Sequence, residues 1–121
     1  MEYVSYVIYG ILIYLIVKRF LPVKGMKQIT TTQLKEQLND KDKQYVDVRT
    51  AGEFKRNSIR GFKNIPLQTL DKKATQQLDS NKEVVVICQS GMRSKQASKV
   101  LKRLGFTSVT NVKGGMNTWR P

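Results

Sequence analysis

Residues 83–94 read EVVVICQSGMRS, and this stretch decides the fold of the chain. Val84 to Ile87 are four consecutive apolar residues, a run typical of a strand buried on both faces of a parallel sheet. A short polar loop containing Gly91 follows, and apolar residues then recur at helical spacing as far as Leu104. A buried strand, a tight loop and a helix in this order predict an α/β protein.

The flanking sequence continues the alternation of strands and helices. Short strands or extended pieces are expected at 28–29, 44–48, 64–66 and 109–112. Helices are expected after Thr30-Thr31-Thr32, over 51–56, from Leu67 to Leu78, and up to Gly105, with a last helical turn between Gly114-Gly115 and Trp119. Such alternation predicts a parallel sheet covered by helices on both faces.

Two features of the composition limit the chemistry. The chain of 121 residues has no histidine, which excludes Cys-His and Ser-His catalysis and ordinary histidine-based metal sites, so no metal is expected. Its single cysteine, Cys88, permits neither an internal disulfide nor a CxxC redox pair. Any chemistry on Cys88 must therefore end on an external acceptor, and a reducing compartment would keep it as a thiol.

The chain is strongly basic, with 22 Lys and Arg against nine Asp and Glu and a net charge of +13. Such a balance favours small anionic substrates or anionic lipid headgroups as partners. A solvated basic surface with no specific partner is the simpler interpretation of the charge alone. No block of basic residues is interleaved with aromatic residues, so a nucleic-acid partner is not expected.

The N-terminal segment differs in character from the rest. Residues 3–17 carry no charge, and their apolar side chains run all round a helix rather than along one face. A helix over this run is about 22 Å long, so spanning the roughly 30 Å bilayer core requires extension to Leu21. We therefore expect a transmembrane anchor at 1–21, a linker at 22–26 and a globular domain at 27–121.

Basic residues set the expected orientation of this anchor. Lys18, Arg19, Lys24 and Lys27 follow the apolar run, which predicts a single-pass protein of the cell membrane with its globular domain in the cytoplasm. A cleaved signal peptide fits less well, because no positive residue precedes the run and no small-x-small site follows it. An apolar arm packed on the domain or on a partner is the other alternative.

The loop from Cys88 to Ser94 is the candidate functional site. Ligands of open α/β sheets bind where the strands end, and Ser90 and Gly91 permit a tight loop whose N–H groups converge on one point. The next helix adds its positive N-terminal end, and Arg93 and Lys95 add charge, so a thiolate is stabilised without histidine. The alternatives are a buried, inert Cys88 and a merely solvated Arg93.

At these residues the sequence resembles the rhodanese-like domain family over most of 27–121. The loop Cys88-Gln89-Ser90-Gly91-Met92-Arg93-Ser94 is similar to the family's C-x-x-G-x-R-S active-site loop. Upstream of it, the family's D-V-R-x-x-x-E-[FY]…G-H-I-x-G-A-x-N-I-P pattern is matched by Asp47-Val48-Arg49, Glu53-Phe54, Ile59, Gly61 and Asn64-Ile65-Pro66. Downstream, Gly114-Gly115-x-x-x-Trp119 resembles the family's ending.

The sequence departs from the family at two places upstream of the loop. Asn57-Ser58 stands where the family has Gly-His, and Phe62 stands where it usually has Ala. In the family that histidine is understood as a supporting residue. We therefore expect altered local packing, with the loop chemistry unaffected.

The resemblance implies a rhodanese-type sulfurtransferase that needs no cofactor. Cys88 would take a sulfane sulfur from thiosulfate or a polysulfide and pass it, as a persulfide, to a thiol or to cyanide. Arg93 is expected to attract the anion and stabilise the thiolate, and Ser94 to cap the helix. The cradle would be formed by Gln89, Ser90, Gly91 and Met92.

The remaining motif residues are expected to support the fold. Asp47, Arg49 and Glu53 would organise the structure beneath the loop, with Arg49 paired to Glu53, and Trp119 would belong to the core. Two further functions are considered. A phosphatase is disfavoured because its loop is C-x5-R and this one is C-x4-R. A membrane-docked persulfide carrier or binding module with little turnover stays open.

Overall fold

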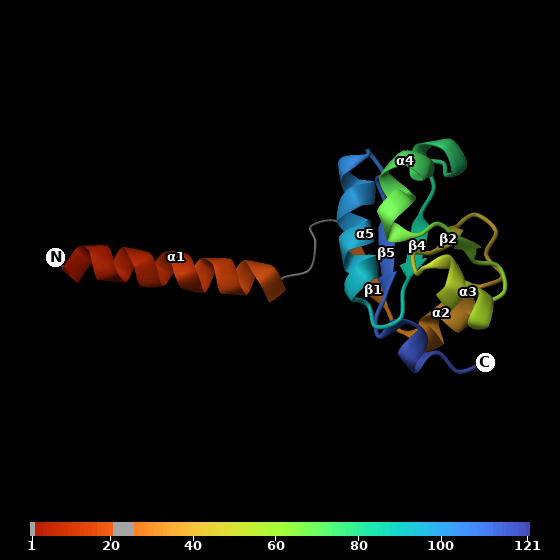
Figure 1. Ribbon diagram of the computed structural model, residues 1–121, viewed down its shortest axis with the longest axis horizontal. Helices are drawn as coiled ribbons and strands as arrows, with labels where there is room; N and C mark the ends of the chain where they lie inside the picture. The colour runs from red at the N-terminus through yellow and green to blue at the C-terminus, as the bar shows by residue number, and fades with distance from the viewer. Residues whose placement is uncertain (1, 21–25) are drawn as a thin grey trace.

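The computed structural model describes residues 2–20 and 26–121 (Figure 1). The strands are β1 (Met26–Ile29), β2 (Gln44–Asp47), β3 (Lys63–Asn64), β4 (Val84–Ile87) and β5 (Val109–Val112). The helices are α1 (Glu2–Phe20), α2 (Thr31–Gln37), α3 (Ala51–Arg56), α4 (Leu67–Gln77), α5 (Met92–Arg103) and a 3-10 turn, η1 (Gly115–Thr118). The expected alternation of strands and helices is confirmed.

The five strands form one sheet in the order β1-β5-β4-β2-β3, and every pairing is parallel. The quoted strand, β4, therefore lies at the centre of the sheet between β5 and β2. Because parallel strands all end at the same edge, the residue after β4 emerges at the middle of that edge. This residue is Cys88.

Both faces of β4 are buried, as its apolar run predicts. Val84 and Val86 pack in one core cluster with residues of α4 and α5, whereas Val85 and Ile87 pack in a second cluster with Leu34 of α2. Figure 1 shows α4 and α5 together on one side of the sheet and α2 and α3 on the other. Alternating side chains of a strand point to opposite faces, so each face needs its own helical cover.

Local sequence signals fix the starts and ends of the helices. Thr30 and Thr50 each cap a helix through a capping box, in which the threonine side chain and a Gln or Glu three residues later satisfy free backbone N–H groups. Gly105 follows α5 with φ +96°, the left-handed conformation expected of a residue that ends a helix.

The α1 helix corrects one expectation. Its apolar side chains from Val4 to Val17 are exposed. The expected transmembrane anchor is wrong, because no helix within residues 2–20 and 26–121 is both long and apolar enough to cross a membrane. Tyrosines at 3, 6, 9 and 14 lower the hydropathy of the run, and Glu2 and Lys18 limit its uncharged length. Of the expected linker, residues 22–25 lie outside the described residues and Met26 begins β1.

Candidate active site

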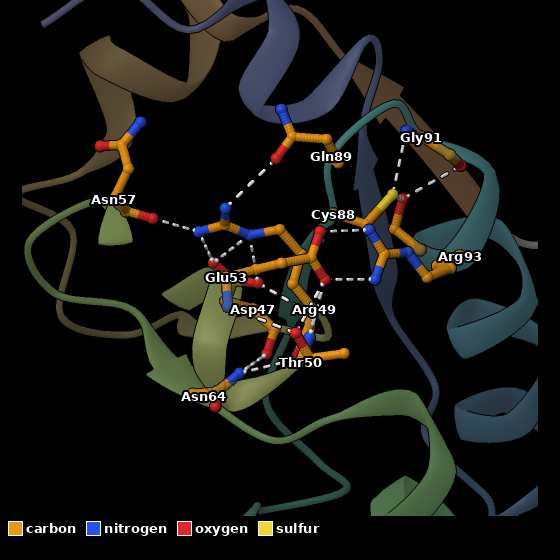
Figure 2. Close-up of polar contacts among 11 residues, drawn as sticks. Asp47, Arg49, Thr50, Glu53, Asn57, Asn64, Cys88, Gln89, Gly91 and Arg93 are labelled. Atoms are coloured by element: carbon orange, nitrogen blue, oxygen red, sulfur yellow. Dashed lines mark hydrogen bonds and ion pairs between the residues drawn. The ribbon is translucent and has the colours of Figure 1, made fainter. Parts of the chain in front are cut away.

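Cys88 lies at the carboxyl end of β4, under a loop that leads into α5. The side chain has no exposed surface, and the backbone N–H of Gly91 donates a hydrogen bond of 2.9 Å to its Sγ (Figure 2). Gly91 has φ +100°, a conformation that favours glycine, and it is the residue that precedes α5. The loop therefore places one N–H donor on the sulfur, whereas Ser90 and Met92 of the expected cradle are exposed.

A buried polar chain continues from the sulfur. The Cys88 thiol donates to Ser94 Oγ over 3.3 Å, and Ser94 Oγ in turn bonds Asn111 Oδ1 of β5. The expectation that Ser94 caps α5 is wrong, because no side chain caps the helix at Gly91 and the buried Ser94 hydroxyl lies against the Gly91 carbonyl, 3.1 Å away, rather than against a free N–H. Asn111 was missed by sequence reasoning, although its polar side chain in the strand expected at 109–112, directly before Val112, was the signal that could have found it.

The turn at Gly114-Gly115 holds the loop from its other side. The N–H groups of Met116 and Asn117 donate to the carbonyls of Cys88 and Gln89 over 2.8 and 2.9 Å. Gly115 has φ +57°, and a Cβ there would lie 2.2 Å from the Cys88 carbonyl oxygen. The family-like Gly-Gly ending thus permits a close approach of two backbones at the base of the loop. Trp119, partly buried, packs against the second core cluster as expected.

Arg93 and Glu53 form the ion pair beside the cysteine. The two guanidinium nitrogens Nη1 and Nη2 of Arg93 donate to Oε1 and Oε2 of Glu53 over 2.6 and 2.9 Å. This bidentate bond holds the pKa of Glu53 at about 2, with help from Thr50 and against the effect of burial. The same hydrogen bond raises the pKa of Arg93. The expected pairing of Arg49 with Glu53 is therefore wrong.

Arg49 pairs instead with Asp47, two residues earlier on the same strand end. Nε and Nη2 of Arg49 donate to the Asp47 carboxylate over distances of 2.8 to 3.1 Å, and both side chains are almost completely buried. Arg49 also donates to Gln89 Oε1 over 3.3 Å and to the Asn57 carbonyl (Figure 2). The structure thus places Asp47 and Arg49 beside the loop, where they connect it to the end of α3.

An open cavity of about 370 Å³ lies next to the loop. It is lined by Arg49, Glu53, Arg56, Asn57 and Gln89. Sequence reasoning did not select Arg56, because it lies outside every motif, and it noted Asn57 only as a departure from the family. Phe62, the other departure, is buried with its ring 5.4 Å from that of Tyr45. The two departures thus lie in the cavity wall and in the core, and the loop keeps its motif.

A parallel α/β sheet presents a buried cysteine at the end of its central strand, beneath the loop that leads into α5, and this arrangement defines a domain with one candidate thiol site. A comparison with known protein families identifies the family to which this domain belongs. The Rhodanese-like domain model matches residues 30–121, and the chain belongs to the rhodanese-like domain family.

Individual relatives agree with this assignment. The chain is 36% identical over 96 residues to YrkF of Bacillus subtilis (strain 168), provisionally named a sulfur carrier protein; the match covers 78% of the chain and only 51% of YrkF. It is 35% identical over 71 residues to thiosulfate sulfurtransferase PspE of Escherichia coli (strain K12), covering 58% of the chain and 68% of PspE. The crystal structure of a rhodanese-like domain protein from Staphylococcus aureus is 35% identical with a TM-score of 0.71, covering 78% and 92%.

Proposed function

We propose that the chain is a sulfurtransferase that carries a sulfane sulfur on Cys88. The observation that carries this proposal is the Gly91 N–H on Cys88 Sγ at 2.9 Å, because an N–H aimed at the sulfur stabilises negative charge on it. Arg93, which is fixed beside the loop by its two bonds to Glu53, places a guanidinium near the sulfur without a histidine. The name of PspE supports thiosulfate as a donor.

The proposed reaction has two steps. The Cys88 thiolate attacks the outer sulfur of thiosulfate, an S–S bond forms at Sγ, and the S–S bond of the donor breaks with its electron pair leaving on sulfite. A thiol acceptor then attacks the outer sulfur of the Cys88 persulfide, which returns the thiolate and transfers the proton of the thiol to the new persulfide. Cyanide as acceptor gives thiocyanate.

Intact-protein mass spectrometry tests this proposal. The full chain is measured before and after thiosulfate or polysulfide, with Cys88→Ser as the control variant. We expect the wild type to gain the mass of sulfur, the variant to gain none, and cyanide to remove the added mass with formation of thiocyanate. Absence of any gain with both donors would refute the proposal, as would an equal gain in Cys88→Ser.

A persulfide carrier with little turnover is the second candidate. The complete burial of Cys88 favours it, because the loop must open further for a bulky acceptor than for a small donor before either reaches the sulfur. The similarity to YrkF, which the chain matches over about half of YrkF's length, supports it as well. Loading that is fast while discharge to small thiols is slow would favour the carrier, and comparable rates of loading and discharge would favour the enzyme.

A further inference from the structure

The charges around the 370 Å³ cavity are unequally neutralised. Two of its lining residues belong to closed ion pairs. Arg49 is bound by the Asp47 carboxylate, and Glu53 is bound by Arg93. These pairs leave little net charge for an incoming ligand, because each guanidinium already has its carboxylate.

The carboxylate of Glu53 already accepts four hydrogen bonds. Besides the two bonds from Arg93, its Oε1 accepts from the backbone N–H and the hydroxyl of Thr50, both over 3.1 Å. This position is fixed by the capping box at the start of α3. Glu53 therefore faces the cavity as a neutralised group.

Arg56 is different. It lies at the end of α3, it is exposed, and it lines the cavity. Within residues 2–20 and 26–121, the structure records neither an ion pair nor a hydrogen bond for its guanidinium. Arg56 follows Glu53 by three residues, a spacing that places two side chains on the same side of a helix. The cavity therefore has a free guanidinium next to the Glu53–Arg93 pair.

The size of the cavity exceeds what one small inorganic anion needs. A volume of about 370 Å³ lies within the range of pockets that hold small organic ligands, roughly 300–1,000 Å³. A guanidinium matches a carboxylate or sulfonate through two parallel hydrogen bonds. A donor with an anionic group separated from its sulfane sulfur could reach Arg56 with one end and the loop with the other.

We propose that Arg56 binds the anionic end of a low-molecular-weight organic persulfide in this cavity and thereby selects anionic over neutral donors. The inference rests on the proposed sulfurtransferase function. Arg56 acts here as a substrate-binding residue that lies outside the C-x-x-G-x-R-S motif. It takes no part in the sulfur transfer itself.

The sulfur transfer from an organic persulfide donor balances in atoms and electrons. The Cys88 thiolate attacks the outer sulfur of R–S–SH and forms a new S–S bond. The S–S bond of the donor breaks, its electron pair leaves on the R–S sulfur, and that sulfur takes the donor's persulfide proton. The products are the Cys88 persulfide anion and R–SH, so no further oxidant or reductant is needed.

A matched pair of donors and a matched pair of variants test the proposal. N-acetylcysteine persulfide carries one carboxylate, and the persulfide of N-acetylcysteine amide has the same size without the charge. Arg56→Gln removes the proposed binding charge. Lys55→Gln removes the neighbouring charge from the same helix at an exposed residue that is not among those lining the cavity.

The measurement is the second-order rate of Cys88 persulfidation in single turnover by intact-protein mass spectrometry. We expect Arg56→Gln to slow the acid donor about fivefold and to leave the amide donor unchanged, and this difference to shrink in high salt. Lys55→Gln should leave both rates unchanged. Equal effects of Arg56→Gln on both donors, or equal effects of the two variants, would overturn the role of Arg56.

The outcome also separates this inference from the function on which it rests. If the wild type is persulfidated by both donors at rates that Arg56→Gln does not change, the inference fails and the sulfurtransferase proposal stands. If the wild type is persulfidated by neither of them, nor by thiosulfate or polysulfide, the proposed function itself fails.

Discussion

Glu53 and Arg93, which are 40 residues apart, join the start of α3 to the first turn of α5 through two hydrogen bonds of 2.6 and 2.9 Å. Glu53 has a second task, since it closes the capping box with Thr50. One carboxylate therefore fixes a helix start and holds the guanidinium beside Cys88 (Figure 2). Because Glu53 has both roles, a substitution that keeps its capping oxygen and removes its charge tests the ion pair separately from the helix cap.

Substituting Glu53→Gln should keep the cap and remove the ion pair, because glutamine also serves as the third residue of a capping box. We expect the free energy of unfolding to fall by about 1 kcal/mol, the scale of a partly exposed pair with good geometry. Urea denaturation measures it. Glu36→Gln, at an exposed carboxylate on α2, is the matched control and should change stability by less than about 0.5 kcal/mol. Equal stability of the wild type and Glu53→Gln would contradict the role of the pair.

The ion pair also predicts a pH dependence. The pKa of Glu53 is lowered to about 2 from its ordinary value of 4.5. A lowered pKa means that the folded state binds this proton less tightly than the unfolded state, so the stabilisation is complete above about 4.5 and is lost as the pH falls through about 2. Urea unfolding of the wild type and Glu53→Gln between pH 6 and pH 2 should show a difference that narrows only below about 4.5. A constant difference over this range would count against the assignment.

Removing Asp47 should have a larger effect than removing any surface carboxylate. Asp47→Ala leaves the guanidinium of Arg49 buried without its counter-ion, and breaking such a pair costs about 3–5 kcal/mol. Thermal and urea unfolding check this value. Asp71→Ala, at an exposed carboxylate on α4, is the control and should stay within about 0.5 kcal/mol of the wild type. A comparable small loss for both variants would mean that the buried pair is dispensable.

Two glycines should respond to alanine in opposite directions. Gly115→Ala places a Cβ against the Cys88 carbonyl at a positive φ, so we expect a loss of about 2 kcal/mol or more and slower persulfidation of Cys88. Gly52→Ala lies in helix α3 with nothing within 4 Å, so a gain of about 0.5–1 kcal/mol is expected with the rate unchanged. Unfolding curves and mass spectrometry measure both quantities. A Gly115→Ala protein with unchanged stability and rate would show that the close approach is not required.

The fold could be predicted from the sequence because its signals are local. The apolar run of β4, the threonines at 30–32 and Gly105 each act within a few residues of themselves, and each structure formed where expected. The α1 helix formed as well, but it is not apolar enough to cross a membrane, because its tyrosines and flanking charges lower its mean hydropathy.

The site could be predicted only as far as the motif itself. Cys88 and Arg93 lie together as expected, but the partner of each charge depends on how α3 and α5 pack, which no local pattern contains. Glu53 therefore forms its ion pair with Arg93, and Arg49 forms its ion pair with Asp47. The place of Arg56 in the cavity wall also depends on tertiary packing, because the cavity lies between α3 and the loop after β4.

The enclosure of Cys88 has a consequence for the lifetime of the protein under oxidative stress. A thiol without exposed surface meets peroxide only when the loop over it opens, which slows its oxidation to sulfenic and then irreversibly to sulfinic acid. The chain has no second cysteine that could trap a sulfenic acid as an internal disulfide. The burial of Cys88 thus limits its oxidation, a task that a second, resolving cysteine performs in other proteins. In the proposed reaction the form open to oxidation is the persulfide, whose outer sulfur would extend about 2 Å beyond Sγ.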